Sequence, residues 1–461
     1  MEIKLETYVV FISFITSFFA IFLSNGIIIG VPAIAQEYGM NNVIQNWVPT
    51  IFFLVVAVFT VPAGQISGKF GVKKSLLAGV TVYLIGSIGA VLSLSTEMFL
   101  IFRIMQGAGV AFLNVSAMAM TVHAVSPKKR GQALGFTVTG IYLATSLSPV
   151  ICGFLVNNLG WRAMFYFVIP FLILCMILLV VKVPKEWKTY KDAKIDTLGS
   201  VLYALGILMF IYGFTTLITT YGKILTVAGL ILLVIFAKYE LGQKSPVFNM
   251  HLFENKKFAS SNIAALCSYI ATMVITTILN YHFQYVRGWD PQMAGLILII
   301  TPIIMAIMAP NSGRLSDKIN PQKLAAIGMG ITTVALIILV FLTKDMPLYL
   351  VITAMVLQGI GVGLFSSPNT NAIMSSVPPK DAPTASASQA TMRTIGQTMS
   401  LGLLTLVFAW IMGNLPLSPQ YAGMIISSSQ AICIISIFAA IIAVFASLVG
   451  IKSKDKFNVG N

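Results

Sequence analysis

The most chemically capable residues of this chain lie within an otherwise apolar stretch, Leu100–Ala119. The stretch contains Arg103, Gln106 and Asn114, and a charged side chain at membrane depth costs about 2.5 kcal/mol or more, so it is rarely without a function. Arg103 and Gln106 are three residues apart, which places them on one face of a helix. The pattern predicts a helix whose polar face lines a water-filled cavity. The alternative is an arginine near the end of a span, with its guanidinium reaching the lipid headgroups.

Two glycines follow this polar pair on the same predicted helix. Gly107 and Gly109 carry no side chains, so the backbone of a neighbouring helix can approach closely at these positions. We therefore expect the other face of the helix to pack tightly against a partner helix.

A second polar pattern lies near the C-terminus. Gln389, Arg393 and Gln397 are spaced by four residues, which makes one face of a helix polar from end to end. A helix that packs only against lipid and apolar neighbours would not carry such a stripe, so the pattern predicts a second cavity wall. The alternative is hydrogen bonding between helices, worth only about 0.6 kcal/mol per pair.

The composition decides the class of protein. The chain has 461 residues, of which 57% are hydrophobic and 9% charged, and its mean hydropathy is +0.90. A soluble domain carries roughly 25% charged residues. The apolar runs are about 20 residues long rather than about 10-residue alternations, which favours helices and excludes a β-barrel. We predict an all-α polytopic membrane protein with fourteen transmembrane helices.

Positive charge is distributed unevenly between the predicted loops. With the N-terminus inside, most lysines and arginines fall in the inward loops, and those in the outward loops are Arg162, Lys223, Arg287 and Lys344. This distribution follows the positive-inside rule. We expect a multi-pass protein of the cell (plasma) membrane, surrounded by membrane lipids, with both termini in the cytoplasm. Topology accounts for the net charge of +15, so no nucleic-acid partner is expected.

Signatures of catalysis and cofactor binding are absent from the sequence. It has no GxxxxGK[ST] loop for a nucleotide, no serine nucleophile elbow, and no His/Cys/Asp cluster at metal-ligand spacing. The four cysteines lie in apolar runs without paired spacing, which indicates core packing rather than disulfides or metal ligation. We therefore predict no catalytic residues, no metal and no other cofactor, and the chain is not expected to be an enzyme.

An internal repeat divides the chain. GQISGKFGVKK at Gly64–Lys74 corresponds to GRLSDKINPQK at Gly313–Lys323, and QGAGV at Gln106–Val110 corresponds to QGIGV at Gln358–Val362. Two parallel halves are typical of transporters that move about a central site. The predicted domains are a six-helix bundle at 1–190, an inserted two-helix hairpin at 191–245, and a second, pseudo-symmetric six-helix bundle at 246–461.

Six motifs, in the right order along the chain, resemble those of the major facilitator superfamily in its fourteen-span drug:proton antiporter branch. Besides GQISGKFGVKK and LIFRIMQGAGVA, they are SLSPVICGF, NNLGWRAMFYFVIP, FQYVRGWDPQMAGL and RTIGQ. The resemblance covers nearly the whole chain. It implies export of small amphipathic compounds (multidrug efflux) by alternating access, with proton antiport.

The resemblance also implies site residues, because the first and fourth spans of each half line the pathway in this family. The substrate-binding candidates are polar residues on these spans and their neighbours: Asn25, Arg103, Gln106, Asn114, Tyr142, Asn280, Tyr281, Gln284, Gln358, Asn369, Gln389, Arg393 and Gln397. The gating candidates lie in the repeated loops and at the bend of the fifth span: Gly64, Gly71, Lys73, Pro149, Gly153, Gly313, Arg314 and Asp317.

The chain departs from the family in the first repeated loop. The family has an aspartate there that pairs with arginines and stabilises the outward-facing state, whereas this chain has Gly68. The resemblance therefore places the cytoplasmic lock at Asp317 with Arg314, in the second half. The alternative for Asp317 is a solvated loop carboxylate.

A second departure concerns acidic residues within the membrane. The first span has Ser24 and Asn25 but no carboxylate, and no aspartate or glutamate lies at the middle of any span. Arginines in a cavity suit anionic, zwitterionic or neutral amphiphiles better than cationic drugs. Proton coupling would then use an acid at a span end or a histidine, His123 or His282. Both histidines have the alternative of being packing or interface residues.

The leading functional prediction is a proton-coupled secondary exporter of small molecules, acting as a monomer. Within transport, the alternative is an uncoupled exporter, or an exporter of an anionic or lipid metabolite. Outside transport, the alternative is a membrane sensor of the same fold that binds ligand without net flux.

Overall fold

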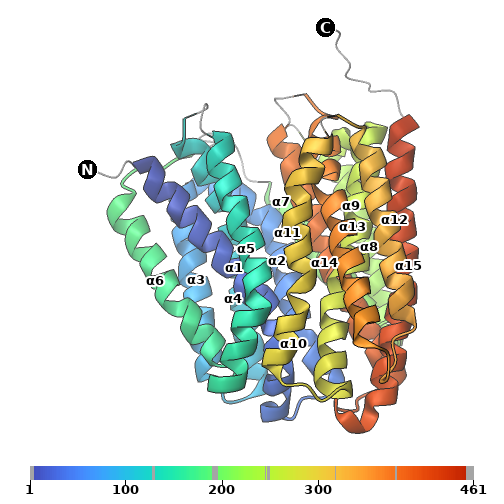
Figure 1. The fold of residues 1–461 in the computed structure, drawn as a ribbon. Helices are drawn as coiled ribbons and strands as arrows, with labels where there is room; N and C mark the ends of the chain where they lie inside the picture. Colours follow the sequence, from blue (N-terminus) through green and yellow to red (C-terminus); the bar gives the residue numbers. More distant parts are fainter. Residues whose placement is uncertain are drawn as a thin grey trace. The chain divides into compact units, whose positions relative to one another are not determined.

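The structure is a computed structural model that describes residues 5–126, 130–188, 196–243, 246, 250–316, 318–378 and 382–452. Within these ranges the regular secondary structure is helical throughout, and 14 helical segments are long and apolar enough to cross a membrane (Figure 1). The predicted all-α class with fourteen membrane helices is therefore confirmed.

The described helices form two groups of six membrane spans with a pair of spans between them, and α10 with α11 makes one span. The first group is α1 (Leu5–Tyr38), α2 (Asn42–Phe70), α3 (Val72–Leu92), α4 (Thr96–Ala124), α5 (Arg130–Leu159) and α6 (Ala163–Lys182). The pair is α7 (Thr197–Thr215) and α8 (Thr220–Leu241), followed by the 3₁₀ turn η2 (Met250–Glu254). The second group is α9 (Lys256–Tyr281) with the π turn η3 (His282–Val286), α10 (Pro291–Leu298) with α11 (Ile300–Ser316), α12 (Pro321–Val340), α13 (Leu348–Met374), α14 (Ala382–Met412) and, after the 3₁₀ turn η5 (Pro419–Tyr421), α15 (Ala422–Lys452).

The chain forms two compact units. The N-terminal unit comprises Met1–Leu208 with Asp290–Leu296, and the C-terminal unit comprises Met209–Trp289 with Ile297–Asn461. The division runs through α7 and α10, so the first turns of α10 group with α1–α6. The predicted hairpin is present as α7 and α8, and its status as a separate domain at 191–245 stays a prediction.

Side chains that bind free backbone N–H groups define where several helices begin. Asn41 accepts a hydrogen bond from the backbone N of Ile44 at 2.9 Å at the start of α2. Asn320 accepts one from the backbone N of Gln322 at 3.0 Å, and Pro321 follows it as the first residue of α12. These are standard start signals, because the first turn of a helix has no internal partner for its N–H groups.

Glycines set the closest helix contacts in the N-terminal unit. There α4 packs on α2 and α3, and α1 packs on α5. A Cβ atom at Gly109 would lie 2.8 Å from the Gly79 carbonyl oxygen of α3, and one at Gly107 would lie 2.7 Å from the Phe52 carbonyl oxygen of α2. The close approach predicted for Gly107 and Gly109 is therefore confirmed.

The C-terminal unit repeats this arrangement. There α13 packs on α11 and α12, and α9 packs on α14. A Cβ at Gly361 would lie 2.6 Å from the Gly328 carbonyl oxygen of α12, and one at Gly359 would lie 2.9 Å from the Thr301 carbonyl oxygen of α11. The repeated sequence motif thus corresponds to a repeated backbone contact within each unit.

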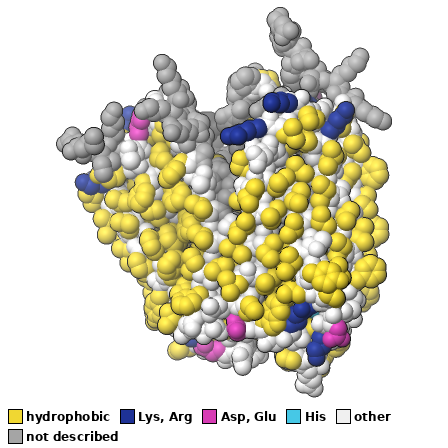
Figure 2. All heavy atoms as spheres, viewed as in Figure 1, with side chains coloured by type: hydrophobic (Ala, Val, Ile, Leu, Met, Phe, Trp, Pro, Cys, Tyr) yellow, Lys and Arg dark blue, Asp and Glu magenta, His cyan; other side chains and the backbone are white. Residues whose placement is uncertain are grey.

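Apolar and charged side chains occupy different parts of the visible surface. Hydrophobic side chains cover the flanks of the helices, whereas the visible Lys, Arg, Asp and Glu side chains gather near the helix ends (Figure 2). Many large apolar side chains, such as Leu174, Ile224 and Phe438, are exposed. Exposed apolar flanks are expected of helices that face lipid.

Candidate functional site

Arg103 of α4 is enclosed within the N-terminal unit, with no exposed surface (0%). Its Nη1 donates to Gln106 Oε1 at 2.6 Å, its Nε donates to the Val48 carbonyl oxygen at 3.3 Å, and its guanidinium carbon lies 4.4 Å from the centre of the Phe52 ring. Gln106 in turn donates from Nε2 to Ser87 Oγ at 3.3 Å. Arg103 therefore links α4 to α2, and Gln106 links α4 to α3.

This environment corrects the expectation of a water-filled space beside Arg103. The guanidinium is held by groups of α2 and α4, and only Nη2 has no hydrogen-bond partner among the described residues. The alternative of reaching the lipid headgroups is also wrong, because the side chain has no exposed surface. The prediction that Arg103 and Gln106 share one helix face is confirmed, and the two side chains are hydrogen-bonded there. The roles of Arg103 and Gln106 in substrate binding stay predictions.

Arg393 of α14 has a different environment. It is half-buried, and it makes no ion pair or hydrogen bond with any residue that the structure describes. No side chain from Ser388 to Ala409 is exposed, so this part of α14 does not face lipid. The polar stripe of α14 therefore lies inside the protein.

The two glutamines of this stripe differ from each other. Gln389 donates from Nε2 to Thr370 Oγ1 of α13 at 2.5 Å, so the alternative of bonding between helices is realised at this position. Gln397 is half-buried and has no hydrogen-bond partner in the described part of the chain. The polar groups of Arg393 and Gln397 thus make no hydrogen bond within the described part of the chain, and their roles in substrate binding stay predictions.

The remaining polar candidates of the C-terminal unit mostly bond within it. Gln358 donates from Nε2 to the Thr272 carbonyl oxygen at 3.4 Å, and Asn369 donates from Nδ2 to the Ser261 carbonyl oxygen at 3.1 Å. Both side chains are buried and join α13 to α9. Their roles in substrate binding stay predictions.

Three further candidates lie at the end of α9. Gln284, in η3, donates from Nε2 to Asn280 Oδ1 at 2.8 Å. Tyr281 is buried, with its ring 5.9 Å from those of Tyr285 and Phe408. The structure thus brings the three predicted residues together around a π turn, a distortion that is frequent at functional sites.

Two further candidates of the N-terminal unit, Asn25 on α1 and Asn114 on α4, have fewer contacts than Arg103. Asn25 and Asn114 are half-buried, and neither has a hydrogen-bond partner among the described residues. The side chain of Tyr142 lies outside the described part of the structure.

The junction of α2 and α3 contains a residue that the sequence patterns did not single out, Glu186. Gly71 ends α2 with φ +125°, and a Cβ atom there would lie 2.5 Å from the Glu186 carboxylate. Glu186 Oε1 accepts from the backbone N of Lys73 at 2.8 Å, and Oε2 accepts from that of Lys74 at 3.1 Å. The backbone N of Val72 donates to the Trp187 carbonyl oxygen at 2.9 Å. A carboxylate at a helix N-terminus is stabilised by the unpaired N–H groups and the helix dipole.

The sequence contains only an indirect sign that Glu186 contacts the start of α3. Helix α3 begins after Gly71, which has no side chain to cap it. The segment after α6 contains Glu186 close to the membrane end of that helix, but no sequence spacing places it beside residue 73. The gating roles of Gly71 and Lys73 stay predictions, and Glu186 joins them as a contact residue.

The part of α5 that contains Pro149 and Gly153 packs closely on the first turns of α10, inside the N-terminal unit. A Cβ atom at Gly153 would lie 2.6 Å from the Pro291 carbonyl oxygen, and one at Gly295 would overlap the Pro149 carbonyl oxygen. Asn158 donates from Nδ2 to Gln292 Oε1 at 3.3 Å. The small residues near Pro149 therefore permit direct backbone contact, and the gating roles of Pro149 and Gly153 stay predictions.

The repeated loops differ in how far they can be described. Gly64 and Gly313 are half-buried, and Arg314 is exposed at the end of α11. Asp317 lies outside the described residues, so its predicted pairing with Arg314 stays a prediction.

A polar network closes the other end of the N-terminal unit. Glu37 at the end of α1 forms an ion pair with Arg162 at 2.7 Å and accepts from Trp161 Nε1 at 2.7 Å. Arg162 also donates from Nε to the Val91 carbonyl oxygen at 3.0 Å and from Nη2 to that of Ser93 at 3.3 Å. These donors satisfy carbonyl groups at the end of α3 that have no partner within the helix.

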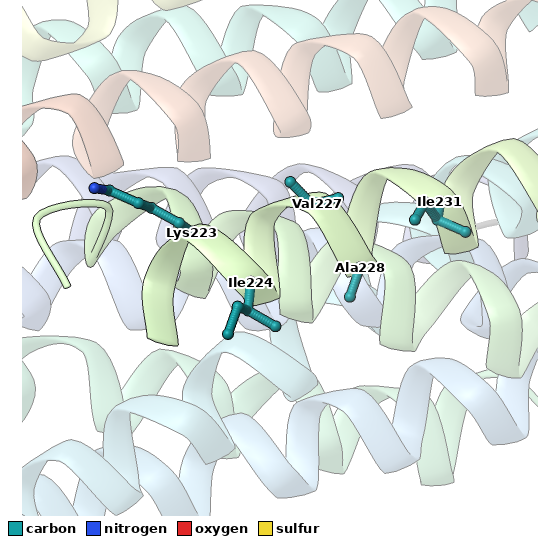
Figure 3. Close-up of a pocket in the computed structure, with 5 residues that line it drawn as sticks. All are labelled: Lys223, Ile224, Val227, Ala228 and Ile231. Carbon is teal, nitrogen blue, oxygen red and sulfur yellow. The ribbon is translucent and has the colours of Figure 1, made fainter. Parts of the chain in front are cut away.

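A shallow groove lies on α8, lined by Lys223, Ile224, Val227, Ala228 and Ile231 (Figure 3). All five come from one face of a single helix, and the three larger apolar side chains are exposed. None of the predicted site residues lines it. We regard this groove as part of the lipid-facing surface.

Comparison with known proteins gives the family. The Major Facilitator Superfamily model matches residues 13–401. The chain is 26% identical over 401 residues to riboflavin transporter RibZ of Clostridioides difficile (strain 630), covering 87% of this chain and 88% of RibZ. It is 27% identical over 410 residues to multidrug resistance protein Stp of Mycobacterium tuberculosis (strain CDC 1551 / Oshkosh), covering 86% of this chain and 75% of Stp.

Solved structures show the same fold. A bacterial homologue of the human lysosomal transporter Spinster, inward-facing and unoccupied, matches with a TM-score of 0.72 at 16% identity, over 98% of this chain and 99% of that chain. A D-xylose–proton symporter matches with a TM-score of 0.70 at 14% identity, over 99% of this chain and 100% of that chain. The chain belongs to the Major Facilitator Superfamily and is a membrane transporter, not an enzyme.

Proposed function

We propose that the chain is a secondary exporter of small amphipathic compounds, resident in the cell membrane with both termini in the cytoplasm, which works by alternating access and proton antiport. A relative named as a riboflavin transporter supports transport of small organic molecules, and one named as a multidrug resistance protein supports export. Those relatives are 26–27% identical to this chain, so the class of substrate is inferred from the chain's own polar side chains.

The main observation in support of alternating access is the repeated glycine contact between the third and fourth spans of each half. Alternating access needs bodies that keep their internal packing while the transport pathway changes. Backbone contacts at Gly79–Gly109 and Gly328–Gly361 provide such packing within each unit, because they leave no side chains to rearrange.

Proton antiport needs a group that titrates, and His282 is the candidate that the geometry favours. It is buried in η3, and its Nε2 accepts from Arg287 Nε at 3.0 Å. His123 is exposed near the end of α4, and the Glu37 carboxylate is already paired with Arg162. Protonation of His282 would place two cations side by side and end its bond with Arg287, so it would change local structure.

An uncoupled exporter of anionic compounds is the second candidate. The observation in its favour is the half-buried Arg393, which no described carboxylate neutralises. A membrane sensor of the same fold would bind such compounds without moving them.

Two measurements test the proposal. Efflux of varied lipophilic compounds from a host that lacks its own pumps should rise when the chain is expressed. In proteoliposomes, efflux should then be faster with a pH gradient than without one. Equal rates in both conditions would exclude antiport and favour the uncoupled exporter, whereas binding without net flux would exclude export altogether.

A further inference from the structure

Among the described membrane-spanning helices, two arginines lie well away from a helix end, Arg103 and Arg393, and their environments differ. The guanidinium of Arg103 is enclosed and bonded to Gln106 and to the Val48 carbonyl oxygen. That of Arg393 has room beside it, because the side chain is only half-buried, and it bonds to no described residue. Arg103 therefore stabilises the packing of the N-terminal unit, whereas the guanidinium of Arg393 has no hydrogen-bond partner among the described residues.

The depth of Arg393 makes this unsatisfied charge informative. It lies eleven residues after the start of α14 and nineteen before its end, or about 16 Å and about 28 Å along a helix that rises 1.5 Å per residue. The side chain cannot reach the lipid headgroups by lying along a lipid-facing surface, because the surrounding part of α14 faces protein. A deep charge without a partner is expensive, so a partner of opposite charge is expected.

The neighbouring helices supply no such partner. Helices α9, α13 and α15 pack on α14. None of these four helices contains an aspartate or a glutamate anywhere in its sequence. These helices therefore supply no counter-charge to Arg393, and an anionic ligand could provide one.

We infer that Arg393 binds an oxyanion group, such as a carboxylate, sulfonate or phosphate, on the transported compound; this inference rests on the proposed transport function. The planar guanidinium offers two parallel donors that match two oxygens of such a group. Gln397 lies one turn further along the same helix face with its amide free, so it can bind a polar group next to the anion. Gln389, already bonded to Thr370, is not part of this pair.

Three pyrene probes of similar size test the inference: pyrenebutyrate is anionic, pyrenebutanol is neutral and pyrenebutylamine is cationic. The thermal stability of the purified full-length protein is measured against the concentration of each, since a ligand that binds the folded state raises the melting temperature. The wild-type protein should bind pyrenebutyrate most tightly. Arg393→Gln should weaken that binding about ten- to a hundredfold, because charge-assisted hydrogen bonds contribute about 1.5–3 kcal/mol. Arg393→Lys should restore part of it.

The controls separate binding from folding. Trp410→Leu, at an exposed position on the same helix (74% exposed), should leave the preference unchanged. The melting temperature of each variant without probe reports its folding. The inference is overturned if no probe binds, if the alcohol or the amine binds as tightly as the acid, or if the preference for the acid survives Arg393→Gln. Efflux of neutral or cationic compounds by the same protein would leave the transport function standing even then.

Discussion

The Glu186 carboxylate accepts a hydrogen bond from the backbone N of Lys73 at 2.8 Å, so the segment after α6 caps the first turn of α3. The same carboxylate reaches Lys74 at 3.1 Å, and no side chain of α3's own N-cap competes with it. In the second half, Asn320, the residue directly before the corresponding helix α12, caps that helix. The free N–H groups in the first turn of α3 and of α12 are therefore bonded by different acceptors: a distant glutamate in the first repeat and a neighbouring asparagine in the second.

This contact predicts a specific loss of stability. Glu186→Ala should lower the free energy of unfolding by about 1 kcal/mol, the usual cost of removing a helix cap, and Glu186→Gln should lower it less because one acceptor oxygen remains. Lys185→Gln, an exposed neighbour, is the matched control. Thermal unfolding of the purified variants measures the difference. Equal melting temperatures for Glu186→Ala and the control would refute the capping role.

The glycine contacts predict opposite effects at two positions of the same residue type. Gly109→Ala should destabilise the N-terminal unit by about 1–3 kcal/mol, because the added Cβ meets backbone atoms of Gly79 and Tyr83 that cannot turn aside. Gly330→Ala, on α12, meets nothing within 4 Å and should be neutral or stabilising, since alanine favours a helix by about 1 kcal/mol over glycine. Thermal unfolding and the amount of protein in the membrane check both outcomes.

The enclosure of Arg103 predicts a structural phenotype rather than a change in selectivity. Arg103→Met should lower the free energy of unfolding by about 1–3 kcal/mol, because Gln106 Oε1 and the Val48 carbonyl oxygen lose their donor in a buried setting. The order of preference among the anionic, neutral and cationic pyrene probes should stay as in the wild type. A full-stability variant that has lost its preference for anions would instead assign substrate binding to Arg103.

The bond between His282 and Arg287 predicts how transport responds to a proton gradient. His282→Gln keeps an acceptor for Arg287 but cannot titrate, so efflux should continue while losing its acceleration by the gradient. Arg287 also donates to the Met346 carbonyl oxygen, and Asp345 lies near enough to favour its charge, so the variant should keep that junction. His123→Gln is the control. Unchanged gradient dependence in His282→Gln would remove this histidine from the coupling mechanism.

A third histidine has a pKa that can be predicted in direction. The hydrogen bond from His251 Nδ1 to Glu254 Oε1, at 3.1 Å, raises the pKa of His251 above its ordinary value of 6.5. Because the folded-state pKa is the higher one, the stabilisation is fully present below the unfolded-state pKa and is lost as the pH rises through the folded-state pKa. NMR titration of the protein's three histidines, assigned with single His→Gln variants, should show a lower pKa for His251 in Glu254→Gln. An unchanged value would contradict the bond.

The sequence was sufficient for the architecture and for contacts that depend on one helix. Long apolar runs predict fourteen spans because only helices satisfy a backbone in lipid. The spacing of Arg103 and Gln106 predicts that they share one helix face, where the structure shows a hydrogen bond between them, and Gly107 and Gly109 predict close packing. Each of these follows from helix geometry alone.

Contacts between distant segments could not be predicted in the same way. Spacing places Arg103 on a helix face but does not say that Val48 and Phe52 cover that face. Likewise, residues 73 and 186 are far apart in sequence, so nothing in either local pattern indicates that they meet. The same limit made Arg103 and Arg393 look equivalent, although one is bonded and the other is not.

The paired backbone contacts at Gly79–Gly109 and Gly328–Gly361 also limit how this protein can evolve. No genetically encoded residue is smaller than glycine, so every substitution at these four positions adds atoms where another backbone already lies. Attempts to redirect the transporter toward new cargo should therefore hold these sites constant. Diversity is better introduced at Arg393 and Gln397, whose half-buried side chains bond to no described residue.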